Sequence, residues 1–168
     1  MKSRLAEAAV SGWLLLPLAA GALESDRQQP VSIEADRAEL DQSSGVGVYT
    51  GGVVVVQGSM RLEADRLEIK SPGGGIESAV ATGRPARFKQ RPEGHQEDVV
   101  GGGQQIDYLA TEARVILTGE AWVTQAEDTV RGARIEYDLE SDQIQALRGP
   151  GDQDRVQIIL QPRPSTDN

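Results

Sequence analysis

The stretch TGGVVVVQGSMRLEADRLEI, residues Thr50 to Ile69, is the centre around which this chain is organised. Its four consecutive valines stand between Gly51-Gly52 and Gly58-Ser59, and both of these pairs are turn signals. Valine favours a strand because its branched side chain packs well on a pleated surface and crowds the preceding turn of a helix. The stretch therefore predicts a strand over Val53 to Val56, flanked by turns and followed by an alternating segment.

The segment from Ser59 to Lys70 requires a choice between helix and strand. It is rich in Arg, Leu, Glu and Ala, and Met60, Ala64 and Leu67 would share one face of a helix. The same unit returns 68 residues later, and there its residues are poor helix formers: Val130, Gly132, Ile135 and Tyr137. Two copies of one unit share one structure, so we predict a strand in both.

Short repeats run through much of the chain. At the 68-residue offset, one set of residues recurs in order: Thr50, Gly51, Gln57, Arg66 and Glu68 become Thr118, Gly119, Gln125, Arg134 and Glu136. A shorter copy, Ile33 to Leu40, lies upstream, and Thr82-Gly83 begins a further unit that leads to Ala86 and Phe88. Repeated short strands punctuated by Thr-Gly predict an all-β, stacked architecture.

The apolar alternation changes phase at three matching places. These are after Asp36, between Ala64 and Leu67, and between Gly132 and Ile135. Side chains along a strand alternate with a period of 2, so the phase cannot change without a bulge, bend or corner. We therefore expect strands that turn a corner and continue in a second sheet.

Glycine and proline mark the remaining segments. We expect loops or flexible points at Ser71 to Gly75, Gln90 to Glu97 and Gly101 to Gly103, and a strand that starts at Pro85. The final strand, Asp154 to Leu160, is apolar and no cap is recognisable after it. Its edge would offer unpaired N–H and C=O groups to another molecule, and we expect its alternate residues to form an oligomer edge: Val156, Ile158 and Leu160.

Length, charge and composition fit one exported domain. The chain has 168 residues, 38% of them hydrophobic, and no cysteine, which excludes disulfides and thiolate chemistry. Residues 1–22 have the pattern of a signal peptide, which leaves a domain over 23–164 and a disordered tail at 165–168. Loss of Lys2, Arg4 and Glu7 with that peptide would leave a net charge of −10. Such a charge argues against nucleic acid and anionic membrane surfaces as partners.

No cluster of residues points to catalysis, a metal or a cofactor. The only histidine, His95, stands in a polar loop, where a solvated side chain is expected. Asp36 and Asp65 occupy equivalent repeat positions, and we interpret them as corner residues that satisfy turn amides rather than as paired catalytic carboxylates. Trp122 stands in an apolar strand and is expected in the core rather than against a sugar. We predict no enzyme activity.

Five motifs follow one another in the order of a known family. They are Pro30 to Asp36, Tyr49 to Val53, the Gly83-x-Pro85-Ala86-x-Phe88 unit, Leu117 to Ala121, and the strand that begins at Arg155-Val156. Together they resemble the OstA-like family of LptA-type periplasmic lipopolysaccharide-transport proteins. The resemblance extends over nearly all of the chain from Gln29 to Pro162.

Membership of this family implies a twisted β-jellyroll of stacked antiparallel strands, open at both ends. It implies an apolar groove that carries the lipid A portion of lipopolysaccharide across the periplasm. It also implies head-to-tail homo-oligomers between an inner-membrane LptC-like protein and an outer-membrane LptD-like protein. By position, five residues would contact lipid, although core packing would explain each of them equally well: Val31, Ile33, Phe88, Ile106 and Tyr108.

Other interpretations remain open at this point. A membrane-anchored LptC-like relative shares the implied fold but needs a longer, uncleaved anchor than Trp13 to Ala20, and an LptD-like N-terminal domain would precede a large barrel. From a different class, a secreted structural or carbohydrate-directed β-repeat protein would assemble or act on polysaccharide and ignore lipid. Lipopolysaccharide binding separates these classes.

Overall fold

The computed structural model describes residues 26, 29–92, 95–138, 141, 143–151 and 155–162. The predicted signal peptide and the predicted tail lie outside these residues. Both ends of the predicted domain, at 23 and 164, lie outside them as well, so the domain boundaries stay predictions.

The described residues form ten strands and one short 3-10 helix, which are joined into a single sheet. The elements are β1 (Ser32–Glu34), β2 (Arg37–Asp41), β3 (Val46–Gln57), β4 (Met60–Lys70), β5 (Ser78–Gln90), β6 (Val99–Leu109), η1 (Ala110–Glu112), β7 (Arg114–Gln125), β8 (Asp128–Asp138), β9 (Gln143–Leu147) and β10 (Gln157–Ile159). A strand therefore occupies 60–70, which confirms the choice of strand over helix.

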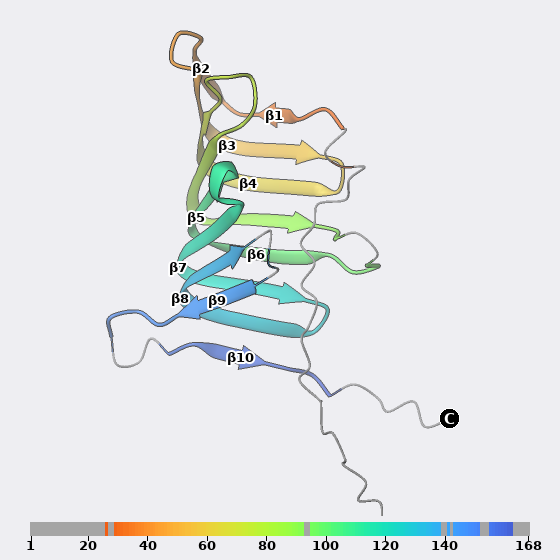
Figure 1. The fold of residues 1–168 in the computed structure, drawn as a ribbon. Coiled ribbons are helices and arrows are strands. Elements are labelled where there is room, and N and C mark those ends of the chain that lie inside the picture. The colour runs from red at the N-terminus through yellow and green to blue at the C-terminus, as the bar shows by residue number, and fades with distance from the viewer. Residues whose placement is uncertain are drawn as a thin grey trace, which may run out of the picture.

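Every pair of neighbouring strands is antiparallel. The order is β1-β3-β4-β5-β6-β7-β8-β10, with β2 also paired to β3 and β9 also paired to β8. Figure 1 shows the strands stacked from β1 and β2 at one end to β9 and β10 at the other. The sheet does not close on itself, so the predicted stacked architecture with two open ends is confirmed.

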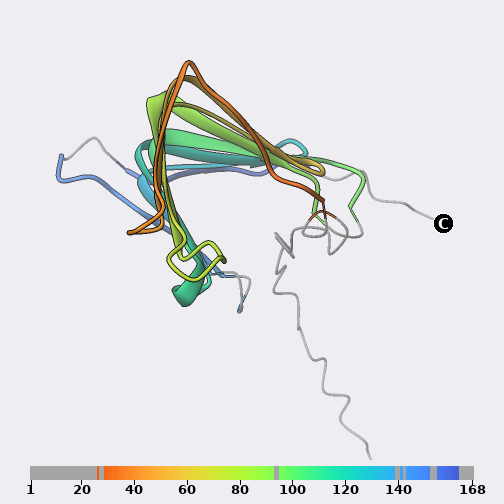
Figure 2. The same ribbon diagram turned by 90° about the horizontal axis from the view of Figure 1, so that it is seen from above.

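Each long strand bends once, and the bends fold the sheet into two facing layers (Figure 2). The cross-strand register shifts between Thr50 and Val53, between Glu63 and Arg66, and at the matching places in β5, β6 and β7. We name the side that carries residues 32–34, 53–57, 60–64, 86–90, 99–103, 121–125, 128–132 and 157–159 the first layer, and the other side the second layer. The expected corners are therefore present, but the expected second sheet is the other half of the same sheet.

The corner glycines lie inside strands rather than between them. In β3, Gly51 and Gly52 have φ values of 82° and 50°, and Gly119 and Glu120 of β7 repeat this conformation with 76° and 53°. The interpretation of Gly51-Gly52 as a turn before the valine strand was wrong, because two left-handed residues in succession bend a strand without ending it. Pro85 likewise lies at the corner of β5, which begins at Ser78 and not at the proline.

A comparison of Gly51→Ala with Gly52→Ala tests the corner. Both residues have positive φ, where an added Cβ costs about 1–2 kcal/mol. A Cβ on Gly51 would also lie 2.3 Å from Oδ2 of Asp36, whereas one on Gly52 meets nothing within 4 Å. We expect urea unfolding to show a loss of about 3 kcal/mol for Gly51→Ala and about half of that for Gly52→Ala. Equal losses would mean that the contact with Asp36 does not constrain the corner.

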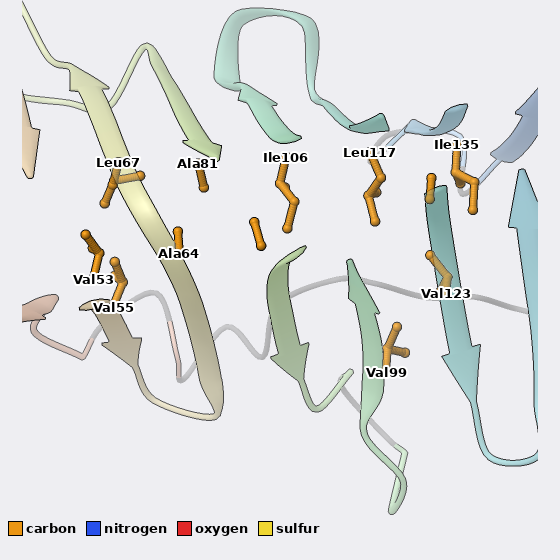
Figure 3. Packing of buried hydrophobic residues seen from close by; sticks show 12 residues of the cluster. Val53, Val55, Ala64, Leu67, Ala81, Val99, Ile106, Leu117, Val123 and Ile135 are labelled. Atoms are coloured by element: carbon orange, nitrogen blue, oxygen red, sulfur yellow. The ribbon is translucent and has the colours of Figure 1, made fainter. Parts of the chain in front are cut away.

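Buried side chains from both layers meet in the space between them (Figure 3). Leu67, Leu117 and Ile135 are at most 1% exposed. Gly101 to Gly103 are buried within β6, so their assignment as a flexible point was wrong. They leave room for neighbours, since a Cβ on Gly101 would lie 2.4 Å from Cε1 of Phe88. Trp122 was also misplaced: it is only half-buried, because the alternation that turns Ala121 and Val123 inward turns Trp122 to the outer face.

Candidate functional site

A pocket with a volume of about 490 Å³ lies between the two layers. It runs across the strands, from Val31 ahead of β1 to Ile144 in β9. Aliphatic and aromatic side chains provide most of its wall: Val31, Val55, Met60, Leu62, Leu67, Ile69, Ile76, Ala79, Phe88, Val99, Ile106, Tyr108, Val115, Leu117, Val123, Ile135, Tyr137 and Ile144. We call this pocket the groove.

Cross-strand rows of the first layer explain the shape of the groove. Residues opposite one another in a sheet point to the same face, so each row lines the groove at one depth. The row at the corner is small: Val53, Ala64, Ala86, Gly103, Ala121 and Gly132. The next row carries larger residues except at Gly101: Val55, Leu62, Phe88, Gly101, Val123 and Val130. Small residues let the layers approach at the corner, and the wall grows in bulk away from it.

The second layer supplies the facing wall. One row crosses the layer from Tyr49 to Ala146 through Leu67, Ala81, Ile106, Leu117 and Ile135. The neighbouring row crosses from Gly47 to Ile144 through Ile69, Ala79, Tyr108, Val115 and Tyr137. Both rows are apolar apart from the tyrosine hydroxyls, so the two walls together form one continuous apolar surface.

The residues predicted to contact lipid converge on this groove. Val31, Phe88, Ile106 and Tyr108 line it, with Phe88 in the first layer and Ile106 and Tyr108 in the second. Ile33 is partly buried against the hydrophobic cluster next to the groove. Contact of these side chains with lipid stays a prediction. The sequence alone did not identify Leu67, Leu117 and Ile135 as lining residues, although the phase changes place Leu67 and Ile135 on the inner face.

A polar contact ties the residues ahead of β1 to the first hairpin. The Asp26 side chain lines one end of the groove, and the residue is 6% exposed. The Ser59 hydroxyl donates to Oδ2 of Asp26 at 2.5 Å and accepts from the Arg91 N–H at 3.1 Å. Gln57 Nε2 donates to the carbonyl oxygen of Gln29 at 3.1 Å. These bonds hold the start of the described domain against the turn between β3 and β4.

Charged pairs lie outside the groove. Arg66 and Glu68 of β4, and Arg134 and Glu136 of β8, form ion pairs of 2.8 Å and 2.6 Å on the face opposite the groove. The hydrogen bond from Arg66 lowers the pKa of Glu68, and the hydrogen bond from Lys89 lowers the pKa of Asp98. Asp41 accepts hydrogen bonds from Ser43 and Ser44, which lower its pKa to about 2. Negative charge is thus fixed on the outer surface at neutral pH, while the lining of the groove is apolar apart from Asp26, Gln57 and Gln90.

The titratable residues considered from the sequence do not form a catalytic cluster in the described part of the chain. Asp65 Oδ2 lies 3.6 Å from Nε of Arg84 in an exposed pair, and Asp36 lies beside Gly51, whose carbonyl accepts its backbone N–H. His95 belongs to the loop between β5 and β6. Within the described residues, no three His, Cys, Asp or Glu side chains are placed to hold a metal ion. The groove itself therefore offers shape and apolar surface.

Both ends of the sheet carry exposed apolar side chains. Val31 and Leu40, at the edge formed by β1 and β2, are 44% and 67% exposed. At the edge formed by β9 and β10, the exposed residues are Leu147, Ile158, Ile159 and Leu160, with exposed fractions between 37% and 62%. Val156 precedes β10 and is partly buried. The predicted oligomer edge is thus an edge of the sheet, and its role in assembly stays a prediction.

None of the helical turns in the described part of the chain is long and apolar enough to span a membrane. A folded antiparallel sheet around an apolar groove, with exposed apolar residues at both open ends, defines a class of β-sheet proteins suited to holding elongated apolar ligands.

Comparisons with known proteins identify the family. Residues 32–143 match the model of the LptA/(LptD N-terminal domain) LPS transport protein family, and the chain belongs to this family. It is 38% identical over 148 residues to the lipopolysaccharide export system protein LptH of Pseudomonas aeruginosa, and this alignment covers 84% of this chain and 85% of that protein. It is 33% identical over 154 residues to the lipopolysaccharide export system protein LptA of Escherichia coli, and this alignment covers 90% of this chain and 82% of that protein.

A solved structure agrees with the fold. The crystal structure of LptH, the LptA-homologous periplasmic component of the lipopolysaccharide transport device of Pseudomonas aeruginosa, superposes with a TM-score of 0.73 at 37% identity. The match covers 82% of this chain and 99% of the other. The family and the fold predicted from the motifs are therefore confirmed.

Proposed function

We propose that this protein carries lipopolysaccharide through the periplasm by holding acyl chains in the groove between its two layers. The observation that carries the proposal is the continuous apolar lining contributed by strands from β3 to β9. Burial of hydrocarbon contributes about 0.8 kcal/mol per CH₂ group, so one chain of roughly a dozen carbons would contribute on the order of 10 kcal/mol before costs. The groove needs no catalysis to do this work.

The charge of the protein indicates that the acyl chains and the head group of the lipid occupy different environments. The chain has a formal net charge of −9, and its described ion pairs lie on the outer surface. An acidic protein gains nothing from contact with phosphate groups, so the anionic head group of the lipid stays in water while the groove holds the chains. Energy for directional movement comes from elsewhere in the transport pathway.

The two open ends of the sheet are the proposed docking sites. Strand addition at the β1 and β2 edge or at the β9 and β10 edge would join copies head to tail, and would continue the groove from one copy to the next. At the ends of such a bridge, the same edges would receive an inner-membrane LptC-like protein and an outer-membrane LptD-like protein.

Site-specific photo-crosslinking tests this function. We expect a photoreactive residue at Val31, Phe88 or Tyr108 to crosslink to lipopolysaccharide, because these positions line the groove. The same residue at Arg87 or Trp122, on the opposite face of β5 or β7, is the matched control and should give no adduct. Adducts at all five positions, or at none of them in a protein that has native circular dichroism, would contradict the proposal and favour a structural or carbohydrate-directed role.

A further inference from the structure

In three hairpins the first strand ends in a glutamine, and the three glutamines lie on the same face of the sheet. Gln57, Gln90 and Gln125 are the last residues of β3, β5 and β7. Gln57 and Gln90 line the groove, and Gln125 lies opposite Val99, which is a lining residue. Opposed residues of antiparallel strands share a face, so all three side chains belong to the inner face at the outer margin of the first layer. We call this row of glutamines the lip.

The lip marks the change from an apolar wall to water. Towards the corner, the inward residues of these strands are Val55 and Val53, Phe88 and Ala86, and Val123 and Ala121. Beyond the lip, each hairpin turns. Each amide thus occupies the position where a chain held in the groove would join its polar head group.

The lip offers hydrogen bonds without charge. Lys89 and Arg91, on either side of Gln90 in the sequence, both contact the Asp98 carboxylate, at 2.8 Å and 2.9 Å, and this single negative charge offsets one of their two positive charges. Among the described residues, the amides of Gln90 and Gln125 have no side-chain hydrogen-bond partner, whereas Gln57 donates to Gln29. A neutral amide donates to a carbonyl oxygen and accepts from a hydroxyl, and it avoids the desolvation cost of a charge at the edge of an apolar wall.

The amides of the lip recur at regular intervals along the groove, which is the proposed path of transport. One strand lies between Gln57 and Gln90 in the sheet order, and one between Gln90 and Gln125, so neighbouring glutamines of the lip are two strand spacings apart. Neighbouring strands lie about 4.8 Å apart, so equivalent amides recur about every 10 Å along the groove. A ligand that moves from one hairpin to the next exchanges one amide for an identical one against a similar apolar wall, which keeps the energies of successive positions close.

From these observations we infer that the lip recognises the carbonyl-bearing ester or amide linkages through which acyl chains join their head group, and that it provides equivalent stations along the groove. The inference rests on the proposed function, because it concerns the ligand of the same groove. It adds a specificity, because the protein would distinguish acylated amphiphiles from plain hydrocarbon through Gln90 and Gln125. Gln57 is the member of the lip that contacts the residues ahead of β1.

The test compares two probes in fluorescence titrations of the full folded protein. One probe is lipopolysaccharide, and the other is N-phenyl-1-naphthylamine, which is apolar and carries no carbonyl group. The Gln90→Leu/Gln125→Leu double variant keeps the approximate side-chain volume and removes the hydrogen bonds. We expect about a tenfold loss of lipopolysaccharide affinity and less than about a twofold change for the naphthylamine. The two single variants should each lose about threefold, because their positions are equivalent.

The matched control is Gln143→Leu/Gln145→Leu, at two exposed positions of β9 on the face opposite Ile144. It should bind both probes as the parent does. Unchanged lipopolysaccharide affinity in the lip variant would overturn the inference alone, and equal losses for both probes would overturn it too, since the amides would then act through the shape of the groove. Failure of the parent to bind lipopolysaccharide would instead reject the proposed function.

Discussion

Phe88→Asp is expected to abolish lipopolysaccharide binding while the protein stays folded. Phe88 lies near the end of β5, lines the groove, and is only partly buried, so an aspartate there can be hydrated in the empty groove. A bound acyl chain would remove that water and leave an unpaired carboxylate against hydrocarbon. The cost of several kcal/mol corresponds to a loss of affinity of at least about 100-fold.

Arg87→Asp is the matched control for this variant. Arg87 precedes Phe88 in the same strand, is exposed, and points to the opposite face, so its substitution introduces the same carboxylate outside the groove. Titration with lipopolysaccharide should give near-parental affinity for Arg87→Asp and no saturation for Phe88→Asp. Circular dichroism should show the parental fold for both proteins. Binding by a folded Phe88→Asp protein would place the lipid outside the groove.

The periodic features of the fold were accessible from the sequence, because local physics determines them. The family resemblance implied inward positions for Phe88, Ile106 and Tyr108, and these three residues line the groove. The phase change between Ala64 and Leu67, which the alternation alone revealed, coincides with a register shift in β4. A pattern along one strand cannot reveal, however, that the chain on both sides of a corner stays in one sheet. That depends on hydrogen bonds to the neighbouring strands on both sides of the bend.

The errors have a common physical cause. Glycine is a turn signal when only local freedom is considered, but Gly101 lies inside β6 because the ring of Phe88 on the neighbouring strand occupies the space of its missing side chain. Trp122 was assigned to the core by residue type, whereas the alternation with Ala121 and Val123 turns it outward. In both cases the cross-strand neighbour or the strand period outweighs the tendency of the single residue.

The site was only partly predictable for the same reason. The residues of one wall follow from alternation along its strands. The groove, however, exists because the corner brings two walls to face each other, and the pattern of a single strand does not reveal the distance between the two layers. Gln57 and Gln125 were visible as equivalent positions in the repeat. Gln90 could be added only after the register of β5 against β6 placed it opposite Val99, in the same row.

Two lysines at the β10 edge are expected to block self-association. Ile158 and Leu160 are 59% and 62% exposed, and within the described residues β10 has β8 as its neighbour on one side and no strand on the other. Charged side chains on an edge strand oppose the addition of another strand. Light scattering of Ile158→Lys/Leu160→Lys should give the mass of a monomer at concentrations where the parent forms oligomers. Gln96→Lys/Thr111→Lys adds the same charge in exposed positions between the inner strands and should associate as the parent does.

Head-to-tail assembly also predicts a specific result when two variants, each blocked at a different edge, are mixed. Leu40→Lys blocks the opposite edge, where Leu40 in β2 is 67% exposed. Each blocked protein alone has one usable edge, and a heterologous contact needs one edge of each kind, so each should be a monomer. An equimolar mixture retains one free β1 and β2 edge and one free β9 and β10 edge, and should form a dimer and nothing larger. If like edges paired with like, each blocked protein would instead dimerise on its own, and the groove could not continue from copy to copy.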